Sequence, residues 1–186
     1  MRIFGIDPGS ERTGYGCVES DGSRHRMVTC GAIASAASVS FANRLLAIHA
    51  GLSTLLADCR PDCVAIENLF FAVNVRSALK LGHARGVAML AAVEAGVPVA
   101  EYTPAEIKRA VVGFGRAEKQ QVGQMVRLLL GLDVVPAPHD AADAIAVAIC
   151  HIHSCTASIA EATAAARPRR VARGARPLTS WRDFRP

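Results

Sequence analysis

The 186-residue sequence lacks an apolar run long enough to cross a membrane. A membrane-spanning helix needs about 20 apolar residues in succession, whereas the apolar stretch around Met89–Val93 ends at Glu94. A signal peptide is not expected either, because Asp7 interrupts the first apolar segment. Together these absences predict a cytoplasmic protein that does not contact membranes and whose six cysteines are reduced.

The chain also lacks the composition of a disordered or repetitive protein. Apolar residues make up 51% and charged residues only 20%, and no internal repeat is present. A chain of 186 residues is suited to one compact domain. It is shorter than a kinase or an ATPase built from two full domains usually is, which argues against those classes.

Positive charge is concentrated at the end of the chain. Seven arginines and one aspartate lie within residues 167–186, so this segment accounts for the net charge of +5. We therefore predict a folded domain over residues 1–155 and a basic tail, rich in Ala and Arg, over residues 156–186. Such a tail either attracts DNA phosphates or only remains solvated, and both readings stay open.

Hydrophobic periodicity predicts the fold class. Three strand candidates joined by short turns open the chain, and strands joined in this way must pair antiparallel. Helical and strand patterns then alternate, and three helices close the domain. The sequence therefore predicts an α/β fold with a five-stranded mixed sheet flanked by helices. The expected strands are Arg2–Asp7, Thr13–Glu19, Arg26–Ile33, Cys63–Ile66 and Val97–Tyr102, and the expected helices begin at Phe41, Val75, Thr103, Glu118 and His139.

Four acidic residues stand at places where a fold can bring them together. Asp7 and Glu67 each end an apolar strand, while Asp140 and Asp143 begin an apolar helix. If the first and fourth strands are neighbours, Asp7 and Glu67 emerge side by side. Residues three apart share one face of a helix, so Asp140 and Asp143 can close the same site.

Clustered carboxylates repel one another unless a cation neutralises them, so the four acids predict a metal site. Oxygen ligands select hard ions, above all Mg²⁺, and Mn²⁺ is expected to substitute. Two such ions can stabilise the attacking and the leaving oxygen of a phosphodiester, which predicts phosphodiester hydrolysis. Taken singly, each acid also has a purely structural explanation as a turn residue, a helix cap or an exposed strand end.

Five ordered segments of this sequence resemble the RuvC family of Holliday-junction resolvases, within the ribonuclease H-like superfamily. The resemblance covers residues 1 to about 153 and implies a homodimer that binds four-way junction DNA and nicks two strands symmetrically, in recombination and repair. It implies 5′-phosphate and 3′-hydroxyl products, two ions held by the four acids, and a branch-migration partner of the RuvAB type. The matching segments are Gly5–Ser10 with Thr13–Gly16, Ala65–Glu67, Ser77–Gly82 with Ala84–Ala88, Val111–Gly113 with Ala117–Lys119, and Asp140–Ala144.

The resemblance also implies DNA-binding residues. Lys108 and Lys119 match basic positions beside the cleft, with solvated helix lysines as the alternative. Phe70 matches an aromatic that stacks on an unpaired base, although its neighbour Phe71 confuses the assignment and either ring could fold into the core. Three further cations on the helix from Val75 could contact phosphates or remain solvated: Arg76, Lys80 and Arg85.

Two features of the sequence each have more than one explanation. The small residues Gly82 and Gly86 match the family's dimer contact, but they equally suit packing within one chain. His139 precedes Asp140 and is an auxiliary ligand, a general base or a plain flanking residue.

Three other functions share part of this sequence pattern with the junction nuclease. A related nuclease of the same fold could cut RNA, and an actin-like ATP-binding protein begins with a similar Asp-x-Gly-Ser loop, although the length opposes it. A binding module without catalysis would need an incomplete acidic set, whereas all four positions here hold an acid.

Overall fold

The computed structural model describes residues 1–36, 38–68 and 74–165. Five strands and five helices follow one another in this part of the chain. The strands are β1 (Arg2–Asp7), β2 (Arg12–Ser20), β3 (His25–Ala34), β4 (Cys63–Glu67) and β5 (Val99–Tyr102). The helices are α1 (Phe41–Cys59), α2 (Val75–Glu94), α3 (Pro104–Val112), α4 (Lys119–Leu129) and α5 (His139–Ala165).

The predicted mixed sheet is confirmed, with strand order β3-β2-β1-β4-β5. β1 pairs antiparallel with β2, and β2 pairs antiparallel with β3, as the short turns between them require. β4 and β5 run parallel to β1, because helices α1 and α2 carry the chain back between strands. The first and fourth strands are therefore neighbours.

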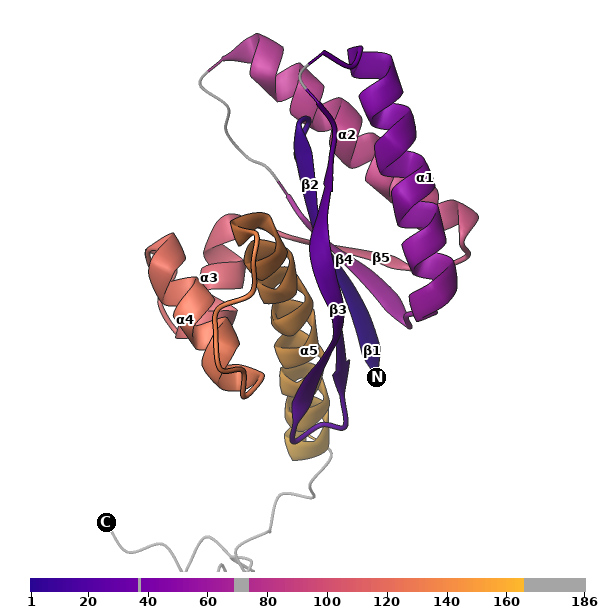
Figure 1. Ribbon diagram of the computed structural model, residues 1–186. Helices are drawn as coiled ribbons and strands as arrows, with labels where there is room; N and C mark the ends of the chain where they lie inside the picture. The colour runs from indigo at the N-terminus through magenta and orange to yellow at the C-terminus, as the bar shows by residue number, and fades with distance from the viewer. Residues whose placement is uncertain (37, 69–73, 166–186) are drawn as a thin grey trace, which may run out of the picture.

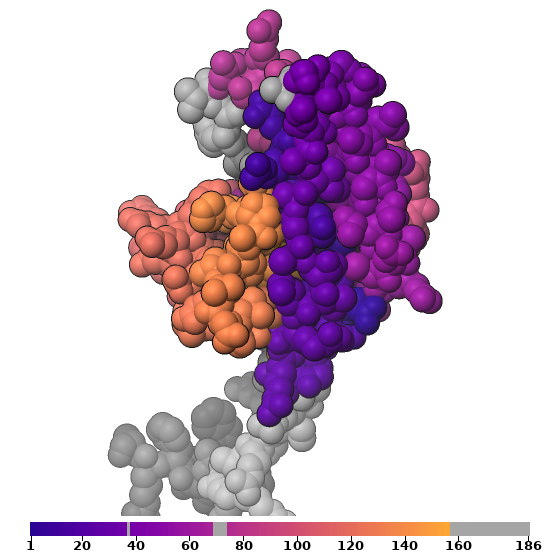
Figure 2. Space-filling model, in the orientation of Figure 1, coloured from indigo at the N-terminus to yellow at the C-terminus, as the bar shows by residue number. Residues whose placement is uncertain are grey.

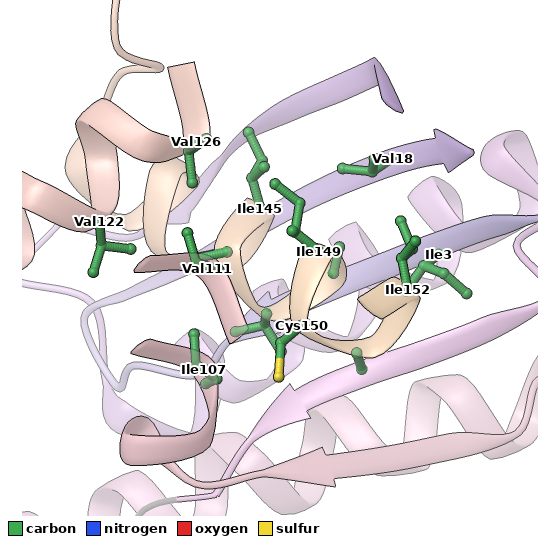
Figure 3. Close-up of a cluster of buried hydrophobic side chains, with 14 of the residues drawn as sticks. Ile3, Val18, Ile107, Val111, Val122, Val126, Ile145, Ile149, Cys150 and Ile152 are labelled. Atoms are coloured by element: carbon green, nitrogen blue, oxygen red, sulfur yellow. The ribbon is translucent and has the colours of Figure 1, made fainter. Parts of the chain in front are cut away.

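Helices cover both faces of the sheet, α1 and α2 on one side and α3, α4 and α5 on the other (Figure 1). Side chains alternate between these layers along each strand. In β1, Phe4 and Ile6 pack toward α1 and α2, while Ile3 packs toward α5. Figure 3 shows the second of these cores, in which Ile145, Ile149 and Ile152 of α5 lie over the sheet.

Local sequence signals explain where the helices begin. Ser40 caps α1 by accepting a hydrogen bond from the backbone N–H of Asn43. Thr103 and Glu106 form the reciprocal capping box expected from the sequence, with Pro104 at the first helical position of α3. This box fixes α3 directly after β5, so the helix starts at the same end of the sheet as the acids.

α5 is longer than the pattern predicts. Its apolar periodicity suggested an end near His153, but the helix continues to Ala165, into the segment predicted as a tail. Residues 156–165 are rich in alanine, the strongest helix former, which lets the helix continue after its apolar stripe has ended. Across residues 1–36, 38–68 and 74–165, no helix combines the length and the apolar character needed to span a membrane.

Candidate active site

The ends of two neighbouring parallel strands bring Asp7 and Glu67 together. Ile6 of β1 lies opposite Ile66 of β4, and each acid follows as the last residue of its strand. The two carboxyl groups lie close enough for each to affect the pKa of the other. Distant parts of the sequence thus meet at one edge of the sheet, as the pattern predicts.

The start of α5 lies against the same place because glycines let the helix approach the sheet closely. A Cβ added at Gly5 would lie 2.0 Å from the carbonyl oxygen of Ala144, and one added at Gly14 would lie 2.0 Å from that of Asp140. Both distances are far below van der Waals contact, so no larger residue fits. Gly5 faces α5 on the same side of β1 as Asp7, which places the first turn of the helix beside that acid.

Lys119 joins Asp143 to the strand acids. Its Nζ donates to Oδ2 of Asp143 over 2.9 Å, and the bond raises the pKa of the lysine. The same ammonium group also interacts electrostatically with Asp7 and Glu67. Asp7, Glu67 and Asp143 therefore share one local electrostatic environment around Lys119.

Burial and mutual repulsion make these acids hard to ionise. Burial is the largest cause that raises the pKa of Asp7, to about 8, and Glu67 and Asp143 add to the rise while Lys119 opposes it. Burial also raises the pKa of Glu67 above its usual range. Groups that resist carrying negative charge alone are groups that a bound cation would stabilise.

Asp140 points to a different partner. Its Oδ2 lies 3.6 Å from Nε of Arg12, at the start of β2. In the part of the chain that the structure describes, no three His, Cys, Asp or Glu side chains are grouped closely enough to hold a metal ion. The four predicted ligands thus gather at one end of the sheet, but Asp143 is paired with Lys119 and Asp140 with Arg12, and the four are not closed around a common centre.

The donor chemistry at this place fits a hard divalent cation. All four candidate ligands are carboxylates, which Mg²⁺ and Mn²⁺ prefer. The Lys119 ammonium and the Arg12 guanidinium each form an ion pair with one of them. The residue types present therefore fit a hard divalent cation, although the four side chains are not grouped around one point.

A cavity of about 60 Å³ opens beside the acids. Glu67, Asp143, Lys108 and Lys119 contribute to its wall. Both lysines predicted to hold phosphate thus lie next to the carboxylates. In Figure 2 the orange surface around the start of α5 borders the indigo surface of the first strands at this end of the sheet.

The other predicted DNA contacts differ in their surroundings. Arg76 is exposed at the start of α2, but Arg85 is engaged with Glu101 of β5 in an ion pair. Lys80 stands 5.9 Å from the centre of the Phe41 ring. Phe70 and Phe71 lie outside the described residues, and so does the Arg-rich segment 166–186. His139 is exposed beside Asp140 and lines a separate groove between α4 and α5.

Sequence reasoning missed Arg12 and the packing role of the glycines. Arg12 stands only five residues after Asp7. Because the β1–β2 hairpin pairs Asp7 with Gly14, this arginine comes back to the same end of the sheet. The sequence did contain a signal for the close approach of α5 to the sheet. Gly14 and Gly16 lie two residues apart on the same face of a strand, and glycine in a strand often marks the place where another backbone comes close.

The buried acids predict how pH affects the stability of the metal-free protein. The folded-state pKa of Asp7, about 8, lies above its ordinary value of 3.8. The protonated carboxyl therefore stabilises the fold fully below pH 3.8, and this contribution is lost as the pH rises through 8. We expect the melting temperature in EDTA to fall across this range, and to fall less in Asp7→Asn. Exposed Asp58→Asn serves as the matched control and should follow the wild-type curve.

The same melting experiment is repeated with Mg²⁺. Mg²⁺ added near pH 8 should raise the melting temperature of the wild-type protein and raise that of Asp7→Asn less. Equal pH slopes in EDTA for the wild type and Asp7→Asn would contradict the repulsive acidic cluster.

Comparisons with known proteins agree with this fold and chemistry. The family model described as "Crossover junction endodeoxyribonuclease RuvC" matches residues 3–151. A protein of that name from Pelobacter propionicus is 51% identical over 186 residues, which is the full length of both chains. A second, from Syntrophotalea carbinolica, is 58% identical over 153 residues, or 82% of this chain and 94% of the relative.

Solved structures give the same result. The chain superposes on the structure named "T. thermophilus RuvC in complex with Holliday junction substrate" with a TM-score of 0.81 and 37% identity, covering 85% of this chain and 96% of the other. The yeast mitochondrial Holliday junction resolvase Ydc2 shares the fold with a TM-score of 0.58, at 13% identity, over 86% of this chain and 82% of its own.

Proposed function

Because the chain belongs to the RuvC family of crossover junction endodeoxyribonucleases, we propose that it acts as a homodimer that resolves four-way DNA junctions by nicking two strands symmetrically. The observation that supports this most directly is the meeting of Asp7, Glu67 and Asp143 around Lys119. The chemistry of that group suits a phosphodiester substrate, and the family match over residues 3–151 favours a nuclease over the ATP-binding rival.

We propose that Asp7, Glu67, Asp140 and Asp143 hold two Mg²⁺ ions. When bound, the ions would neutralise the substrate phosphate, lower the pKa of the attacking water and stabilise the departing 3′ oxygen. The chain's own part is positioning: β1 and β4 fix two acids rigidly at strand ends, and the glycine contacts hold the first turn of α5 against them. Products would carry 5′-phosphate and 3′-hydroxyl ends.

Lys108 and Lys119 would hold the phosphate in the cavity beside the acids. Both line it with Glu67 and Asp143, so a phosphate there meets positive charge on one side and the acids on the other. Ammonium groups placed where negative charge develops stabilise the transition state. Since Lys119 pairs with Asp143, it would exchange that carboxylate for phosphate as the acids bind cations.

Removing the Lys119 ammonium should slow cleavage much more than it weakens binding. We expect Lys119→Ala to lower the cleavage rate by about 100-fold, the order of effect seen when one charge-stabilising donor is lost. Lys119→Arg should recover part of the rate. Single-turnover cleavage and junction binding without Mg²⁺ measure the two effects. Arg26→Ala, on the far strand β3, is the matched control and should cut normally; an equal loss in both variants would contradict the role.

The dimer would form through α2. The outward face of this helix carries small residues at its centre and exposed apolar residues toward both ends, namely Val75, Leu79, Gly82, Gly86, Leu90 and Val93. A Cβ added at Gly82 or Gly86 would meet no described atom within 4 Å, apart from the helix's own neighbouring backbone, so the glycines are not used for packing within the chain. The buried face of the helix is formed instead by Ala84, Ala88, Ala91 and Ala92.

A charge on this face should separate the subunits. We expect Leu79→Glu and Leu90→Glu to sediment as monomers, because a carboxylate would have to be buried in an apolar interface. Monomers should lose paired nicking of one junction. Leu46→Glu, at an equally exposed leucine on α1, is the control and should remain dimeric. Dimers that persist in both α2 variants would contradict this interface.

One assay tests the proposed function as a whole. The protein is incubated with a synthetic four-way junction, a linear duplex and an RNA–DNA hybrid, each with and without Mg²⁺. Symmetric paired nicks in the junction alone, only with Mg²⁺, are the expected result. Cleavage of the hybrid alone would favour the RNA-cutting rival, and binding without cleavage would favour a non-catalytic module.

We also propose further DNA contacts, a protein partner and a cellular compartment. DNA contacts by Arg76, Phe70 and Phe71 rest on the family resemblance, and Arg85 could contact phosphate only by leaving Glu101. Cooperation with a branch-migration complex of the RuvAB type rests on the same resemblance, as does action in the cytoplasm.

A further inference from the structure

A groove of about 620 Å³ lies between α4 and the start of α5, next to the acids but outside the small cavity described above. Lys119 and Asp143 line both spaces, so their ion pair forms the wall between them. A nucleic-acid strand whose phosphate sits at the carboxylates would therefore have a neighbouring nucleotide at the mouth of this groove. Nothing in the proposed cleavage chemistry uses it.

The groove has a polar rim over an apolar floor. Gln120 and Gln124 stand one helical turn apart on α4, with exposed His139 on the other side. The floor is made by small or apolar residues, Gly123, Val135 and Ala142. Such a combination suits a flat, uncharged ligand that makes hydrogen bonds along its edge.

The amide groups are available for a ligand. The side chain of Gln120 forms no hydrogen bond to any described residue. Gln124 uses its oxygen to accept from Nε of Arg127 at 3.1 Å, which leaves its amide nitrogen as a donor. A glutamine amide offers both a donor and an acceptor, the pattern that matches the edge of a nucleobase.

We propose that this groove takes a nucleobase adjoining the scissile phosphate and that Gln120 and Gln124 read its edge, so that they set the sequence preference of cleavage. The inference rests on the proposed junction nuclease. A base in the groove would anchor the strand beside the acids, and a base whose edge does not match the amides would leave the phosphate displaced. Sequence selection would then act on the cutting step.

The test compares cutting rates on a set of junctions that differ only in the nucleotides flanking the cut. Wild type should show preferred and disfavoured bases, and Gln120→Ala/Gln124→Ala should reduce that preference by at least about fivefold, as expected from one lost base contact. Binding of the junction without Mg²⁺ should change less than twofold. A preference that is unchanged in the double variant overturns the proposal.

Two further measurements separate base recognition from a structural effect. Gln121→Ala is the matched control, because this glutamine caps α4 through the backbone N–H of Glu118 and lies outside the groove. It should leave the preference intact. A 2-aminopurine placed beside the cut should change its fluorescence on binding wild type but not the double variant, and an equal change in both would also overturn the proposal.

The outcomes distinguish this inference from the proposed function. If wild type cuts no junction, the nuclease proposal fails, whereas normal cutting with an unaltered preference in the double variant refutes the groove alone. An equal slowing on every sequence would show that the glutamines support the fold or the phosphate site rather than read a base.

Discussion

Asp7→Asn should abolish junction cleavage while leaving junction binding intact. Asp7 lies close enough to Glu67, Asp143 and Lys119 for each of them to affect its pKa. An amide keeps the shape of the side chain but removes its charge. Losing a ligand that contributes several kcal/mol of transition-state stabilisation corresponds to at least about a 1,000-fold loss of rate.

The measurement is single-turnover cleavage of a four-way junction, with binding followed separately in EDTA. Asp58→Asn, an exposed change on α1, is the control and should cut at the wild-type rate. Asp7→Asn should also melt at a higher temperature than wild type in EDTA near pH 8, because it removes a buried repulsive charge. A variant that cuts normally would disprove the carboxylate site, and one that loses binding and cleavage together would indicate misfolding.

Gly14→Ala should disturb both stability and activity, although the glycine lies in a strand and touches no substrate. Its added methyl group would lie 2.0 Å from the carbonyl oxygen of Asp140 and 3.0 Å from the Cβ of the same residue. Neither backbone can move without shifting β2 or the first turn of α5. Overpacking of this kind costs about 3 kcal/mol, and the shift carries Asp140 and Asp143 away from the strand acids.

Urea unfolding and cleavage rates measure the two consequences of Gly14→Ala. Gly115→Ala is the matched control, since its added Cβ would lie 3.4 Å from the nearest atom, the carbonyl oxygen of Ala105, in ordinary contact. It should change the free energy of unfolding by less than about 1 kcal/mol. If Gly14→Ala is as stable and as active as the control, the glycine contact does not position α5.

The sequence alone predicts the sheet and the acidic set because both depend on local pattern. The strands Arg2–Asp7 and Cys63–Glu67 consist mainly of apolar residues, and each ends at an acidic residue. Short turns forced the first three strands to pair antiparallel, and the capping box at Thr103 fixed the start of α3. These signals need no knowledge of distant contacts.

Contacts between distant segments could not be predicted in the same way. The pairing of Arg12 with Asp140 depends on how the β1–β2 hairpin meets α5, and that of Arg85 with Glu101 on how α2 lies over β5. The pattern of small residues in α2 suited two explanations, and only the absence of described neighbours at Gly82 and Gly86 favours the outer surface. α5 extends beyond the end of its apolar stripe because alanine favours the helix without adding to a periodic pattern of large apolar residues.

The length of α5 sets the distance between the acids and the last described residue of the chain. Its 27 residues rise about 1.5 Å each, so Ala165 lies about 40 Å along the helix axis from the acids at its first turn. In Figure 1, α5 runs from the end of the sheet where the acids lie to the opposite end. The chain therefore leaves the described part of the fold at the end remote from the carboxylates.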